Sequence, residues 1–97
     1  MFTVKYKVNI LLYHTVERWS YMNYTKRLYD LRIDNDYRQE DVANFLNITK
    51  QAYGMYENGK RNLPIEYLIK LSEFYGVSTD FILNLTNNPN KPKDIEN

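Results

Sequence analysis

Cysteine and long apolar runs are both missing from this 97-residue chain. A chain without cysteine forms no disulfide and no thiolate metal site, and such a composition suits the reducing cytoplasm. A helix that crosses a membrane needs roughly 20 consecutive apolar residues, and no stretch of the sequence comes close to that length. We therefore expect a cytoplasmic protein without a membrane segment.

Histidine and glycine are scarce, with one and three copies respectively. His14 has no Asp, Cys or second His at ligand spacing, so neither a metal site nor histidine-based catalysis is indicated. The sequence also has no glycine-rich phosphate loop, no nucleophile paired with a base and no pair of catalytic acids. We expect no enzyme activity, no metal and no cofactor.

Residues 38–60 have the pattern of two short helices joined by a tight turn. Glu40 and Asp41 stand in the opening turn of the first helix, where carboxylates suit the positive end of the helix dipole. Asn47 suits the turn because it tolerates a left-handed backbone better than any residue but glycine. The residues expected to be buried on this helix recur at helical spacing and are Val42, Ala43 and Leu46.

The second helix of this unit is expected to begin after Thr49, whose hydroxyl is a natural N-cap. Lys50 and Gln51 place long hydrogen-bonding side chains at its tip, where a DNA major groove would receive them. Gly59 is expected to end the helix in a left-handed conformation. The residues expected to turn inward are Tyr53 and Tyr56. This pattern favours a helix-turn-helix unit that reads DNA.

Three further helices are expected around this unit. The first covers residues 24 to about 35, the fourth occupies residues 64–75 with Pro64 in its first turn and Gly76 at its end, and Ser78 caps a short fifth. On the first helix Lys26, Arg27 and Asp30 are expected outside. The apolar residues of the three helices are Leu28, Leu31, Leu68, Leu71, Phe74, Tyr75, Phe81, Ile82 and Leu85.

Together these residues resemble the Cro and phage-repressor helix-turn-helix family, also called XRE-type. The resemblance covers roughly residues 24–88 and rests on the order and spacing of several short motifs. These are Leu31-Arg32, Gln39 to Ala43, Thr49 to Ala52, Tyr56 to Lys60, Pro64 and Tyr75 to Leu83. The resemblance implies an all-α domain of five helices that binds duplex DNA.

The resemblance also assigns roles to individual residues. The residues implied for base readout are Lys50, Gln51, Ala52 and Met55. Those implied for DNA phosphate contacts are Gln39, Thr49, Asn58, Lys60 and Arg61. Arg32 and Glu57 match an arginine-carboxylate pair that links the first helix to the end of the third in the family's phage repressors.

Each of these roles has a plainer alternative. Polar side chains such as Lys50 and Lys60 are more often a solvated surface, and a helical Met55 is more often packing. The formal net charge of +1 is also low for a DNA-binding protein. Its distribution favours DNA, because the charged residues of the segment 49–62 are Lys50, Lys60 and Arg61 against Glu57 alone.

Three residues depart from the family pattern. Arg38 stands where an N-capping Thr, Ser or Asn is usual, and Asn47 replaces the usual turn glycine. Gly54 lies inside the second helix of the unit, where it costs about 1 kcal/mol relative to alanine. These departures suggest modest stability, or ordering of the unit when it docks.

The two ends of the chain lie outside the resemblance. In residues 1–23 apolar residues alternate over six positions, which favours a strand that could pair with the same segment of a second subunit. The alternative is a translated leader before a start at Met22, since Glu17-Arg18-Trp19 can be encoded by a sequence resembling a ribosome-binding site. Residues 89–97 are polar and contain proline, and a flexible tail is expected.

The sequence thus predicts a specific duplex DNA-binding transcriptional regulator, a repressor that occupies a promoter as a homodimer on a two-fold-related operator. One alternative keeps the fold and changes the role to the antitoxin of a toxin-antitoxin pair, with a toxin as partner, or the controller of a restriction system. Another is a protein-binding helical module without DNA function. A co-purifying partner distinguishes the first alternative, and a gel-shift assay the second.

Overall fold

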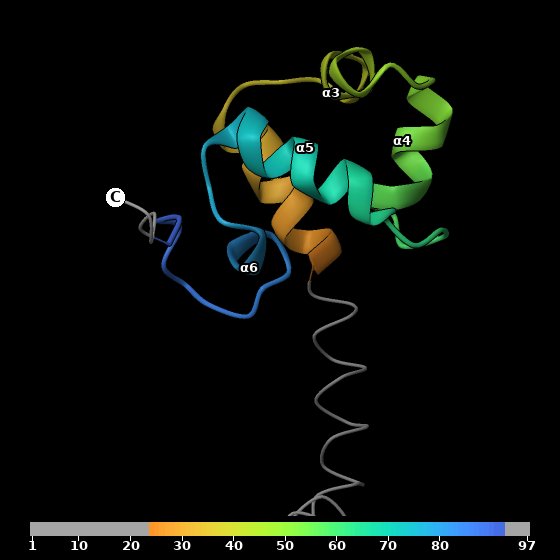
Figure 1. The fold of residues 1–97 in the computed structure, drawn as a ribbon. Coiled ribbons are helices and arrows are strands. Elements are labelled where there is room, and N and C mark those ends of the chain that lie inside the picture. Colours follow the sequence, from red (N-terminus) through yellow and green to blue (C-terminus); the bar gives the residue numbers. More distant parts are fainter. Residues whose placement is uncertain (1–23, 93–97) are drawn as a thin grey trace, which may run out of the picture.

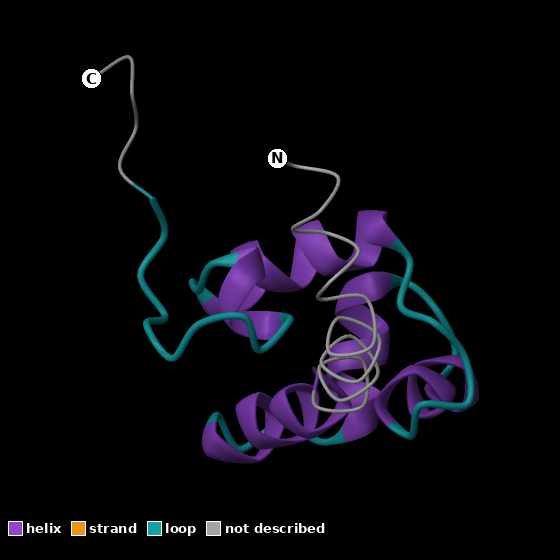
Figure 2. Cartoon of the chain, turned by 90° about the horizontal axis from the view of Figure 1, so that it is seen from below, coloured by secondary structure: helices purple, strands orange, loops and turns teal. Residues whose placement is uncertain are grey.

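The computed structural model of the chain describes residues 24–92, and the predictions for residues 1–23 and 93–97 lie outside this part. Within it the fold is all-α, with five helices and no strand, as predicted (Figure 2). A first helix covers residues 24–34. It is followed by α3 (Gln39–Leu46), α4 (Lys50–Glu57), α5 (Ile65–Tyr75) and the single turn α6 (Thr79–Ile82).

The start of α3 is capped in a way that the sequence conceals. Arg38 occupies the N-cap position with an extended backbone, and its side chain has no acceptor atom for the free amides of the helix. Its own backbone N–H donates to Oδ2 of Asp41 at 2.8 Å, which is one half of a capping box. At the other end Asn47 has the predicted left-handed conformation, with φ of 61°.

The remaining helix ends follow the local signals in the sequence. The Thr49 hydroxyl accepts a hydrogen bond from the backbone of Ala52 at 3.0 Å, and the Ser78 hydroxyl caps α6 in the same way. Gly59 lies just beyond α4 with φ of 77°, a conformation that glycine adopts without steric cost. Pro64 takes the N-cap position of α5, one residue before the first turn in which it was expected.

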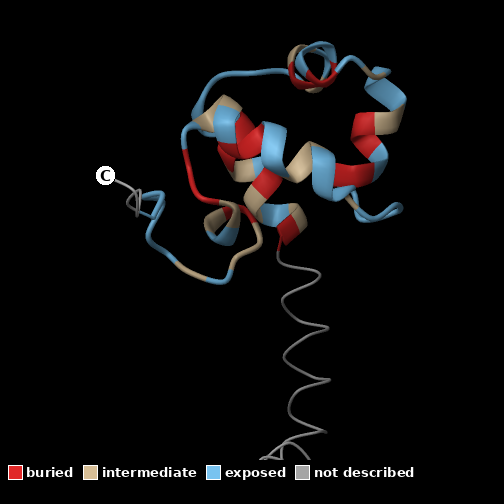
Figure 3. Ribbon diagram, viewed as in Figure 1, coloured by how far each residue is buried: buried red, intermediate tan, exposed pale blue. Residues whose placement is uncertain are grey.

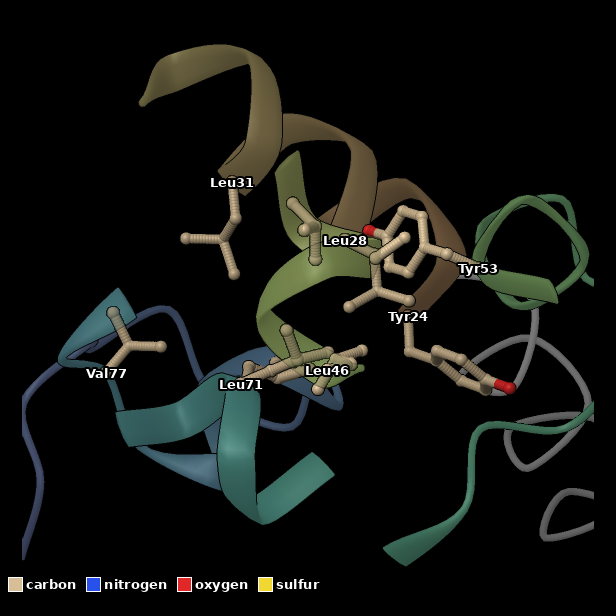
Figure 4. Close-up of a cluster of buried hydrophobic side chains, with 10 residues drawn as sticks. Tyr24, Leu28, Leu31, Leu46, Tyr53, Leu71 and Val77 are labelled. Atoms are coloured by element: carbon tan, nitrogen blue, oxygen red, sulfur yellow. The ribbon is translucent and has the colours of Figure 1, made fainter. Parts of the chain in front are cut away.

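The helices surround one apolar core. In Figure 1, α3 is seen end-on at the top, α4 runs down the right side, and α5 crosses in front of the first helix. Their buried faces turn toward the middle of the molecule (Figure 3). Figure 4 shows the side chains that meet there. The core residues are Tyr24, Leu28, Leu31, Val42, Ala43, Leu46, Tyr53, Leu71, Val77 and Ile82.

Two residues differ from expectation, Arg27 on the first helix and Leu85 after α6. Arg27 was expected outside, but it is half-buried with its guanidinium carbon 3.8 Å from the centre of the Phe81 ring. It also donates a hydrogen bond to Asn84. Leu85 is 62% exposed, because α6 ends at Ile82 and the chain no longer turns a helical face toward the core.

The segment after α6 returns to the domain. The backbone N–H of Ser78 donates to the carbonyl of Pro89 at 2.9 Å, so the contact between α6 and the following chain reaches one residue beyond the expected domain boundary. In residues 24–92 no helix combines the length and the apolar character that crossing a membrane requires.

Candidate nucleic-acid interface

The outer face of α4 presents a line of polar and flexible side chains. Gln51, Met55 and Asn58 are all exposed, and their spacing of four and three residues places them along one side of the helix. The opposite side is buried, with Tyr53 fully inaccessible in the core. Met55 is 39% exposed, so part of its side chain is packed and part is open to solvent.

The N-terminal turn of α4 is open to solvent. Lys50 and Gln51 are exposed there, and no acidic residue stands in this turn. The positive end of the helix dipole therefore adds to the lysine charge. The Thr49 hydroxyl oxygen accepts the Ala52 amide, which fixes the cap and leaves the hydroxyl proton available for another acceptor.

The start of α3 lies close to the middle of α4. A Cβ atom placed on Gly54 would lie 3.5 Å from Oε1 of Gln39, which is an ordinary van der Waals distance. The Gln39 side chain therefore lies against the α4 backbone although it belongs to the preceding helix. This contact places an amide from α3 beside the helix that carries Lys50 and Gln51, and no local pattern in the sequence indicates it.

The loop after α4 keeps its basic side chains free. The backbone amides of Lys60 and Arg61 both donate to the carbonyl of Met55, at 2.9 and 3.2 Å, so the loop folds back on the end of the helix. Asn58, Lys60 and Arg61 are exposed. Within residues 24–92, neither these two cations nor Lys50 takes part in an ion pair. Positive charge thus stands uncompensated at both ends of α4.

A buried ion pair holds the C-terminal end of α4. Arg32 donates from Nε to Oε1 of Glu57 and from Nη2 to Oε2, each at 2.9 Å. Its Nη1 donates to the carbonyl of Tyr37 at 3.0 Å. The side chains of Arg32 and Glu57 are only 11% and 3% exposed. The hydrogen bonds with Glu57 raise the pKa of Arg32, and burial opposes this increase.

The helix order, the left-handed turn and the two capped helices in this arrangement match a known family. A family model described as helix-turn-helix matches residues 28–82, more than half of the chain. The chain belongs to this helix-turn-helix family. The resemblance to the Cro and phage-repressor, or XRE-type, proteins is confirmed. In residues 24–92 no three His, Cys, Asp or Glu side chains are placed to hold a metal ion.

Several proteins named as transcriptional regulators are similar to the chain. The SPbeta prophage-derived uncharacterized HTH-type transcriptional regulator YonR of Bacillus subtilis (strain 168) is 48% identical over 61 residues, which is 63% of this chain and 56% of YonR. The uncharacterized HTH-type transcriptional regulator YobD of the same organism is 35% identical over 74 residues, covering 76% of this chain and 66% of YobD.

A third relative carries a more specific name. The cryptic phage CTXphi transcriptional repressor RstR of Vibrio cholerae is 39% identical over 54 residues, or 56% of this chain and 49% of RstR. The chain therefore spans between 49% and 66% of the length of these three relatives. No solved structure matches the chain significantly.

Proposed function

We propose that this protein is a sequence-specific duplex DNA-binding regulator that represses transcription by occupying a promoter in the cytoplasm. The observation that carries the proposal is the outer face of α4. Its exposed line of Gln51, Met55 and Asn58 has uncompensated lysine or arginine charge at each end. A helix of this form fits a major groove, with phosphates on both sides of it.

Residues in the first turns of α4 are the ones that would contact the bases. Lys50 can donate to O6 and N7 of guanine, and the amide of Gln51 can pair with N6 and N7 of adenine. Ala52 and Met55 can contact a thymine methyl group, which requires only an apolar surface. Of these four side chains, Lys50, Gln51 and Met55 are exposed and Ala52 is half-buried.

Residues around this helix are the ones that would contact the DNA phosphates. Lys60 and Arg61 supply charge from the loop, and Asn58 supplies an amide donor beside them. Thr49 has a hydroxyl proton at the tip of α4, and Gln39 has an amide lying against the same helix. Contacts of this kind fix the position of a protein on DNA and carry no sequence information directly.

The names of the relatives support the regulatory role, and the short length of α4 supports a homodimer. Two of the similar proteins are named transcriptional regulators and one a transcriptional repressor, from prophage or phage sources in two cases. A single α4 of eight residues reads only a few base pairs. Two copies on half-sites about 34 Å apart would read a two-fold-related operator, so we propose a homodimer.

A gel-shift assay on the region upstream of the protein's own gene tests this proposal. The expected result is a complex that survives an excess of random DNA at physiological salt, because specific binding is typically at least about 1,000-fold tighter than nonspecific binding. A matched variant with Lys60 and Arg61 both replaced by alanine should lose binding to both DNAs. Equal binding of the native protein to upstream and random DNA contradicts sequence-specific recognition of this region.

A further inference from the structure

Asn58 is the only asparagine of the chain that is followed by a glycine. The backbone nitrogen of the next residue can attack the side-chain carbonyl carbon of an asparagine, and a next residue without Cβ leaves that attack unhindered. Asn58 and Gly59 are both exposed, between α4 and the basic residues of the following loop. Among residues 24–92 the Asn58 side chain has no hydrogen-bond partner, so its amide is free to react.

The nitrogen that would attack is weakly held. The backbone N–H of Gly59 donates to the carbonyl of Tyr56 at 3.3 Å, whereas those of Asn58 and Lys60 each form a bond of 2.9 Å. An N–H···O distance of about 2.9–3.0 Å is usual, so the Gly59 bond is the weakest of the three. Attack also requires rotation about ψ of Asn58, which is −2° in the folded loop. The adjacent glycine, with φ of 77°, gives the chain the freedom for such a rotation.

We propose that Asn58 is a site of spontaneous deamidation and that this reaction weakens DNA binding. The Gly59 nitrogen forms a bond to Cγ of Asn58, the Cγ–Nδ2 bond breaks, and ammonia leaves with the proton of the Gly59 amide. Water then opens the cyclic imide that results. Opening at one carbonyl leaves an aspartate at position 58, and opening at the other leaves an isoaspartate, in which the backbone runs through Cβ.

Both products alter the DNA interface, and this second half of the inference rests on the proposed function. The amide at position 58 can donate to a phosphate, but a carboxylate is ionised at neutral pH and can only accept. The three basic residues of the segment 49–62 would then stand with two acids in place of one. The new charge lies two and three positions from Lys60 and Arg61. An isoaspartate also lengthens the backbone and so shifts this loop relative to α4.

Incubation of the full chain at physiological temperature and pH tests the reaction without DNA. Peptide mass analysis should show replacement of the amide NH2 by OH at position 58, in a fraction that grows with time. Asn62 is an internal control, because it is exposed in the same loop but precedes Leu63, and it should keep its amide. The variant Asn58→Gln, which would need a six-membered ring, should also stay unmodified. An unchanged mass at position 58, when an unfolded peptide of the same sequence reacts, overturns the proposal.

DNA titrations test the consequence. Asn58→Asp should bind operator and random DNA at least about tenfold more weakly than the native protein, because a phosphate contact is replaced by repulsion. The aged protein, separated by ion exchange, should bind no better than this variant. The control Asn90→Asp makes the same charge change in the exposed segment after α6, on the side away from α4 (Figure 1), and should bind as the native protein does.

The two possible failures are distinguishable. Circular dichroism first establishes that Asn58→Asp is folded at the temperature of the titration. If the native protein binds its operator and the folded Asn58→Asp variant binds equally well, the effect on DNA binding is overturned and the proposed function stands. If the native protein does not bind DNA, the proposed function itself is overturned, together with the part of the inference that rests on it.

Discussion

Arg32 and Glu57, 25 positions apart in the sequence, meet through two parallel hydrogen bonds of 2.9 Å. The pair fastens the first helix to the last residue of α4, so the helix with the exposed Gln51 and Met55 is fixed to the core at the end opposite its tip. Both side chains are almost fully enclosed, which makes the pair costly to break from one side only.

Replacing Glu57 with glutamine should strongly destabilise the domain. The substitution keeps the shape of the side chain but leaves the Arg32 charge buried without its counter-charge, at a cost of about 3–5 kcal/mol. This is a large part of the stability of a small domain, and urea unfolding measures it. The control Asp30→Asn removes the exposed pair with Lys26 and should change stability by less than about 1 kcal/mol. Equal effects of the two substitutions on the free energy of unfolding would show that burial of the Arg32–Glu57 pair does not affect stability.

Replacing Gly54 with alanine should stabilise the domain by about 1 kcal/mol, or raise the melting temperature by about 4–8 °C. Gly54 has an ordinary helical backbone and does not need the conformational freedom of glycine. The added Cβ would meet only Oε1 of Gln39, at 3.5 Å. The matched variant Gly59→Ala should destabilise, because φ is 77° there. A lower melting temperature for Gly54→Ala would show that the contact with Gln39 has no room for a methyl group.

A chain that starts at Met22 should fold and bind DNA, since it keeps the residues 28–82 that match the helix-turn-helix family and the core residues from Tyr24 to Ile82. Intact-mass analysis of the protein from its native cell identifies the true start. Sedimentation of the full-length and shortened proteins then tests the predicted strand arm. Conversion of a dimer into a monomer supports the arm. An unchanged assembly contradicts the arm, and loss of folding in the shortened protein contradicts the prediction that a chain from Met22 folds.

Replacing Lys60 with alanine should weaken binding to operator and random DNA to a similar degree. If the side chain neutralises one phosphate, the slope of log affinity against log salt should fall by about one unit. Titrations at several salt concentrations measure this slope. The control Lys70→Ala removes an exposed lysine on α5 that is 3.9 Å from Glu66, and it should leave the slope unchanged. Equal slopes for the native protein and Lys60→Ala would remove this residue from the phosphate contacts.

Local signals in the sequence predicted much of this fold. Thr49, Asn47 and Ser78 each mark a helix end through chemistry within a few residues, and all three have the expected conformations or hydrogen bonds. The exposure of Arg27 was mispredicted because its environment depends on Phe81, which lies far along the chain and packs beside it only in the folded state.

Some details of the site could likewise be predicted from the sequence, and others could not. The exposed line along α4 follows from helical spacing and could be predicted from the sequence alone. The approach of Gln39 to Gly54 depends on how closely neighbouring helices pack. Periodicity says which residues face inward, but it does not give the distance between two side chains from different helices.

The most direct measurement is a selected-sequence binding assay on the native protein, Gln51→Ala and Lys60→Ala. If Gln51 reads a base, Gln51→Ala should cost roughly 1–3 kcal/mol on the operator and relax the preference at one position of each half-site, with little change on random DNA. Lys60→Ala should keep the selected motif and bind all sequences more weakly. The account is contradicted if Gln51→Ala selects the native motif unchanged, or if Lys60→Ala alters which bases are chosen.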